Sequence, residues 1–220
     1  RGSIGGSTIN MIYLQGPLKN SLNVELQNMC SVTRPTITVQ PTSEPITLAE
    51  AKKQCELSPT DTAHDDHLMM LIQAAREQWE HDTDSCCLTQ TLYVHAEEFE
   101  DEIELPKRPI SSISSIQYYD LTNTLQTLSS SVYSLNPSER EVERKWMQIW
   151  PPTIDRWDAI KITYVAGYAS AALVPAIHKQ AIRLLIGHYF ENRDMIMSDA
   201  LTSIRAYECL VTKFMRASYP

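Results

Sequence analysis

The chain has 220 residues, of which 43% are hydrophobic and 21% are charged, so it can bury a core without a metal ion or a disulfide framework. Its formal net charge of −8 argues against a protein that binds nucleic acid through clustered lysines and arginines. The five cysteines are odd in number and irregular in spacing, which indicates reduced thiols and synthesis in the cytoplasm. No apolar run approaches the roughly 18–20 residues that cross a bilayer.

Residues 1–40 differ from the rest of the chain. They open with the Gly/Ser-rich stretch Arg1–Ser7, and we expect an extended N-terminal arm or an added leader. The remaining residues, 41–220, are predicted to form a single domain of helices and strands.

Two helices are predicted first, over about 47–57 and about 64–83. Thr47 and Glu50 have the spacing of a capping box at the first, and Thr62 and Asp65 have it at the second. The second helix also carries an apolar face at helical spacing, made of Leu68, Leu71, Ile72, Ala75 and Trp79.

The middle of the chain, about 88–165, reads as an antiparallel β meander. Apolar and polar residues alternate from Leu88, and prolines separate short strand-like segments. The segments predicted after the first strand are 113–119, 132–135, 147–150 and 159–165.

Two further helices are predicted at the end of the chain. One runs over about 175–193 with Pro175 in its first turn, and one over about 199–216 with Ser198 as N-cap. The fold class is therefore α+β: a helical bundle of two N-terminal and two C-terminal helices with an inserted antiparallel β meander.

Two clusters could carry chemistry near the second helix. His64, Asp65, Asp66 and His67 offer four metal ligands, but successive helical residues point about 100° apart, which favours a solvated helix start. His81, Cys86 and Cys87 could form a thiolate–imidazole pair, but no orienting group or oxyanion hole is evident. We expect two small thiols at a half-buried helix end.

The middle of the chain holds two more candidates. The acidic run Glu97–Glu104 could suggest paired carboxylates or a calcium loop, but it lacks the turn glycine and ligand spacing, so a solvated hairpin tip is expected. Trp146, Trp150 and Trp157 fit a binding patch and a sheet core equally well.

No phosphate loop, nucleophile elbow or zinc motif is present, and six glycines leave little material for one. We assign no catalytic, cofactor-binding or metal-binding residue and expect a protein that is not an enzyme. A thiol- or metal-dependent enzyme that uses these histidines and cysteines remains a minor alternative.

The order of these elements resembles that of the tailed-bacteriophage head–tail connector family, the head-completion or adaptor proteins. The resemblance covers about residues 44–216 and depends on the order of several short blocks rather than on any one of them. The blocks are Ile46–Lys52, Asp65–Glu80, Leu88–Thr91, Leu105–Asp120, Ile162–Tyr168 and Val174–Arg193.

The resemblance implies a structural role without catalytic residues. Such proteins form a ring, typically of twelve copies, beneath the portal at the virion neck. The ring extends the DNA channel without binding DNA specifically and docks the next neck or tail component. A stopper or tail-completion protein is the alternative within the same assembly. These expectations include no membrane partner and no cofactor.

Overall fold

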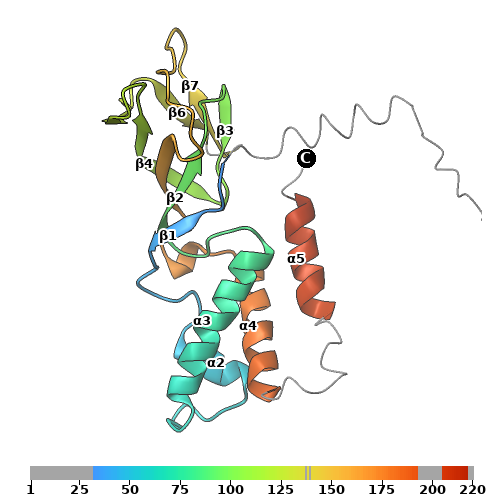
Figure 1. Cartoon of the computed structure of the whole chain (residues 1–220). Helices are drawn as coiled ribbons and strands as arrows, with labels where there is room; N and C mark the ends of the chain where they lie inside the picture. Colours follow the sequence, from blue (N-terminus) through green and yellow to red (C-terminus); the bar gives the residue numbers. More distant parts are fainter. Residues whose placement is uncertain (1–31, 137, 139, 193–204, 218–220) are drawn as a thin grey trace, which may run out of the picture.

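The structure, a computed structural model, describes residues 32–136, 138, 140–192 and 205–217 (Figure 1). It confirms the α+β class, with helices gathered at one end and antiparallel strands at the other. The helices are α2 (Leu48–Gln54), α3 (Asp65–Asp82), the 3-10 turn η1 (Ala171–Leu173), α4 (Ala176–Glu191) and α5 (Arg205–Ala217). The strands are β1 (Thr36–Val39), β2 (Gln90–Ala96), β3 (Glu102–Glu104), β4 (Ile110–Tyr119), β5 (Leu125–Thr127), β6 (Tyr133–Asn136), β7 (Glu141–Arg144) and β8 (Ile160–Ala166).

The strands form two antiparallel sheets. The larger has the order β1-β2-β8-β4-β5 and the smaller the order β3-β7-β6. The last strand, β8, lies between β2 and β4, which places the strand predicted over 159–165 at the centre of the larger sheet. Side chains of β2 and β8 alternate between buried and half-buried, as the period of two in the sequence indicates.

Two hydrophobic cores fill the molecule. One lies within the sheets and includes Leu92, Ile116 and Ile162, and the other joins α3 to α4 through Trp79 and Ile182. None of the helices in the described ranges is long and apolar enough to cross a membrane.

The helix starts show which capping predictions were correct. Thr47 Oγ1 accepts from Glu50 N (3.2 Å) and Thr47 N donates to Glu50 Oε2 (2.9 Å), which confirms the first capping box. The second box is wrong, because His64 is the N-cap of α3 and makes no side-chain cap bond. The preceding loop forms its own turn, in which Asp61 Oδ1 accepts from Ala63 N (2.9 Å). The predicted N-cap Ser198 lies outside the described residues.

The strand predictions failed in two ways. The strand predicted over 147–150 is absent from the described residues: Met147, with a φ of 59°, lies in a turn closed by Gln148 N donating to Lys145 O (3.0 Å), and 148–150 are irregular. The strands β1, β3, β5 and β7 were not predicted, because each has only three or four residues and too little alternation to detect. β1 lies in the predicted extended arm and pairs with β2.

Gly167 connects the sheet to the helices. It has a φ of +105°, and a Cβ at this position would clash with the backbone carbonyl of Leu88. Gly167 N donates to Pro109 O (2.7 Å), and Thr89 N donates to Tyr168 O (3.1 Å). The glycine therefore allows the end of β8 to pass close to the chain that enters β2.

Candidate functional site

The first predicted cluster, at the start of α3, holds helices together. Asp65 pairs with Lys52 of α2 (2.6 Å), and the His64 ring lies edge-on to Phe190 of α4, with centroids 5.7 Å apart. The His67 ring also lies near Phe190, at 6.2 Å. Within the described ranges, no group of three or more His, Cys, Asp or Glu residues is arranged to hold a metal ion.

The adjacent cysteines face different cores. Cys86 packs in the core of the sheets and Cys87 in the core of the helices, and both are almost fully buried. Burial, together with the nearby Glu80, raises the pKa of each thiol to about 12. His81 is exposed. Since a thiol must ionise to act as a nucleophile, Cys86 and Cys87 are unsuited to thiolate chemistry at neutral pH.

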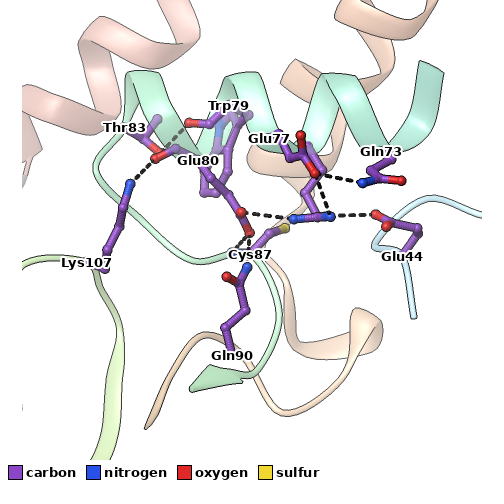
Figure 2. Close-up of polar contacts among 10 residues, drawn as sticks. Glu44, Gln73, Glu77, Trp79, Glu80, Thr83, Cys87, Gln90 and Lys107 are labelled. Carbon is purple, nitrogen blue, oxygen red and sulfur yellow. Dashed lines mark hydrogen bonds and ion pairs between the residues drawn. The ribbon is translucent and has the colours of Figure 1, made fainter. Parts of the chain in front are cut away.

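A buried ionic junction that the sequence reasoning missed lies between α3 and the sheet (Figure 2). Arg76 and Glu80 are both buried, and Arg76 Nη1 donates to Glu80 Oε2 (3.0 Å). Glu80 Oε1 accepts from Cys87 N and from Gln90 Nε2, both at 2.8 Å. The Glu80 carboxylate therefore joins α3 to β2 and to the loop between them that contains Cys87.

The junction extends to both sides of Glu80. Arg76 Nε donates to Glu44 Oε2 (2.8 Å), and Lys107 Nζ donates to the Glu80 backbone carbonyl (2.7 Å). A cavity of about 310 Å³ borders the junction, lined among others by His81, Cys86 and Lys107. The signal in the sequence was a charged pair at i and i+4 on the face of α3 that also carries Ile72 and Trp79.

The geometry assigns the junction a structural role. Both oxygens of Glu80 are occupied by donors from the protein, and burial raises the pKa of the neighbouring Cys86 and Cys87 thiols to about 12, so neither Glu80 nor these thiols is poised to act as a base or nucleophile. Such a hydrogen-bond network can fix the angle between the helices and the sheet.

The acidic run 97–104 divides into two parts. Residues 97–101 form the loop between β2 and β3, in which Glu97, Glu98 and Glu100 are exposed as predicted. The predicted hairpin is wrong, because β2 and β3 belong to different sheets and do not pair. Glu102–Glu104 is strand β3, which pairs with β7, and Ile103 is buried in the core. The solvated part of the acidic run is therefore shorter than predicted, because buried Ile103 anchors residues 102–104 in the smaller sheet.

The three tryptophans of the middle segment also divide. Trp150 is partly buried and stacks on Phe99, with ring centroids 4.7 Å apart and an angle of 7° between the planes. Trp146 and Trp157 are exposed, so the core alternative holds for Trp150 alone, and a binding role for the other two stays a prediction.

Exposed apolar residues gather in the loop after β7, residues 145–150, which we call the tip loop. The exposed fractions are 90% for Trp146, 85% for Met147 and 83% for Ile149. Large apolar side chains this exposed mark interaction surfaces when they lie together. The tip loop is therefore a candidate contact surface.

Comparison with known proteins identifies the fold. No family model and no curated protein matches the sequence. Among the solved chains that match in structure, three share 18% identity with this chain and cover 83% of it and 94–95% of their own length. They come from the neck of an empty gene transfer agent (GTA) particle computed with C6 symmetry (TM-score 0.69), the virion of the native particle (0.68) and the neck of the native particle computed with C12 symmetry (0.62). The chain has the fold of proteins found in the necks of these particles.

Proposed function

We propose that this protein is a structural component of a phage-type neck, where it forms a ring beneath the portal. The observation that carries the proposal is the shared fold, which spans 83% of this chain and 95% of a chain from a neck resolved with C6 symmetry. A related neck was computed with C12 symmetry, in agreement with the twelve copies that the family resemblance implies.

The surface chemistry supports a conduit for DNA. A channel wall must let phosphates slide past, so it should lack the clustered lysines and arginines that release counterions on binding. The chain carries 27 acidic against 19 basic side chains, and the exposed acids Glu97, Glu98 and Glu100 lie together in one loop.

We assign the parts of the chain accordingly. Residues 41–220 form the connector domain, and the arm of residues 1–40 adds strand β1 to its larger sheet. The protein would be made in the host cytoplasm and end in the virion neck, with the portal above it and the next neck or tail component below. It has no catalytic role, in agreement with the buried, protonated thiols of Cys86 and Cys87.

A stopper or tail-completion protein would occupy the same neck but contact a different ring. Binding to the portal separates the two, because only the component directly beneath the portal should bind it in the absence of other neck proteins.

The test is to mix the purified protein with its cognate portal at micromolar concentration and to image the mixture by negative stain. We expect portal rings with an added layer of density at one end. Portal rings that stay bare, while the protein remains free, would contradict the proposal. The same mixture with heat-unfolded protein controls for nonspecific adsorption.

A further inference from the structure

The molecule consists of two halves with separate hydrophobic cores (Figure 1). The helical half contains α2, α3, α4 and α5, and the sheet half contains the two sheets. Among the described residues, no side chain belongs to both cores, and the adjacent Cys86 and Cys87 are divided between them. Burial of apolar surface therefore stabilises each half but contributes little to the angle between the halves.

The boundary between the halves, which we call the waist, is held by polar contacts. It consists of the three segments in which the chain crosses between the halves and one loop of the sheet half, residues 40–47, 83–89, 167–175 and 105–109. Glu80 Oε1 accepts from Cys87 N and Gln90 Nε2, and Cys86 N donates to Arg108 O (2.8 Å). Parts of a chain that are not joined by a large hydrophobic interface are expected to move relative to each other.

Two residues of the waist have an unfavourable backbone conformation. Asp84 has a φ of 47° and Lys107 a φ of 67°, left-handed values that are uncommon for residues other than glycine. Lys107 Nζ connects them, because it pairs with Asp84 Oδ1 (3.4 Å) and donates to the Glu80 carbonyl (2.7 Å). Such conformations persist only where the surrounding contacts enforce them, and they are found in segments that change conformation.

The cavity of about 310 Å³ beside the junction is lined from both halves. Its lining includes Ile37 and Leu92 of the sheet half and Arg76 and His81 of α3. A protein core is close-packed and resists deformation. The open space at the waist instead allows α3 to approach the edge of the larger sheet without displacing core side chains.

We propose that the waist is a hinge, and that the junction around Glu80 holds it at the angle shown in Figure 1. Opening the junction removes the hydrogen bonds to Glu80 Oε1 but leaves both cores intact, so the halves can change their angle without unfolding. The inference rests on the proposed neck function. A subunit that contacts the portal on one side and the next neck or tail component on the other must fit both surfaces, and the hinge angle sets that fit.

Distances between nitroxide spin labels measure the hinge. One pair spans the waist, with Met70→Cys on α3 and Leu125→Cys on β5. Two control pairs each lie within one half: Met70→Cys with Ile177→Cys, and Leu125→Cys with Trp146→Cys. All four positions are exposed. In every variant the native cysteines outside the waist are replaced by alanine, at Cys30, Cys55 and Cys209.

Pulsed electron paramagnetic resonance gives the readout. We expect one narrow distance distribution across the waist in the free protein and a shifted one on portal rings, with both control distances unchanged. In the free protein, Glu80→Ala should broaden the distance across the waist alone. Lys107→Met, which keeps the Glu80 carboxylate, should do the same to a smaller extent. The matched control Glu77→Ala should behave like wild type, because Glu77 is exposed and outside the waist.

The hinge would be refuted if Glu80→Ala and Lys107→Met both kept the narrow distribution of wild type. It would also be refuted if the control distances broadened together with the distance across the waist, since the halves would then not move as bodies. Portal rings that gain a layer without any change in distance would leave the neck function standing and overturn the hinge. Bare portal rings would contradict the neck function, and the variants in free solution would then decide on the hinge alone.

Discussion

At the scale of single residues, stability depends most on charged and titratable side chains that the fold has buried. Arg76, Glu80 and His178 are each less than 7% exposed. Burying a charge is costly unless a partner compensates it, so removing one partner should cost much more than removing an exposed neighbour. Helix α3 offers both kinds of partner for Arg76 within one turn: the exposed Glu77 and the buried Glu80.

Glu80→Ala should lower the free energy of unfolding by about 3 kcal/mol, because Arg76 loses its buried partner and Cys87 N and Gln90 lose their acceptor. The matched control is Glu77→Ala, whose half-exposed carboxylate lies 3.7 Å from Arg76 and should contribute less than about 0.5 kcal/mol. Urea unfolding at neutral pH measures both. Equal losses for the two variants would contradict the structural role of the junction.

His178 should make stability depend on pH. Burial against Trp79 (ring centroids 4.7 Å apart) lowers its pKa from 6.5 to about 4. Between these pH values His178 is protonated in the unfolded chain but neutral in the folded protein. The contribution of His178 to the free energy of unfolding is therefore complete above about pH 6.5 and falls as the pH drops towards 4. The expected loss is about 3 kcal/mol over that window.

The measurement is urea unfolding at a series of pH values for wild type and His178→Gln. The variant should be less stable overall but lose about 3 kcal/mol less than wild type between pH 6.5 and 4. Parallel pH profiles for the two proteins would show that His178 is not the group responsible.

At the scale of elements, the junction between β8 and α4 depends on one glycine. Gly167→Ala should cost about 3 kcal/mol or more, since the residue has a φ of +105° and its new Cβ would clash with Leu88. Gly187 lies inside α4, where an added Cβ would meet Gln54 Nε2 at an ordinary 3.5 Å. Gly187→Ala should therefore stabilise by about 0.5–1 kcal/mol. Thermal unfolding of both variants checks this; a tolerated Gly167→Ala would contradict the described junction.

The helices and central strands were predictable from the sequence because they carry strong local signals. Thr47 and Glu50 form the capping box that their spacing indicates, and the alternation in β2 and β8 matches their burial. Thr62 failed as a cap, because Asp61 formed a competing turn that spacing alone does not reveal. The segment 147–150 resembled a strand, yet local hydrogen bonds from Arg144 Nη1 to Gln148 O and from Gln148 N to Lys145 O turn the chain there.

The candidate site was predicted less well for a physical reason. Buried charges such as Glu80 depend on partners distant in sequence, Gln90 and Lys107 among them, and no spacing pattern encodes these contacts. The partial burial of Trp150 likewise depends on Phe99, which is distant in sequence.

At the scale of the whole molecule, the acidic balance should keep the protein off DNA. We expect no retardation of duplex DNA at micromolar protein even in about 50 mM salt, where phosphate contacts are strongest. An electrophoretic mobility assay measures this, with a basic DNA-binding protein as positive control. Salt-dependent binding would contradict the conduit account.

The central claim, a ring beneath the portal, is tested most directly by cryo-electron microscopy of the protein mixed with its cognate portal. The account predicts twelve copies of this α+β fold around a continuous channel at one end of the portal. A resolved portal with no such density, although the protein is present in excess, would contradict it.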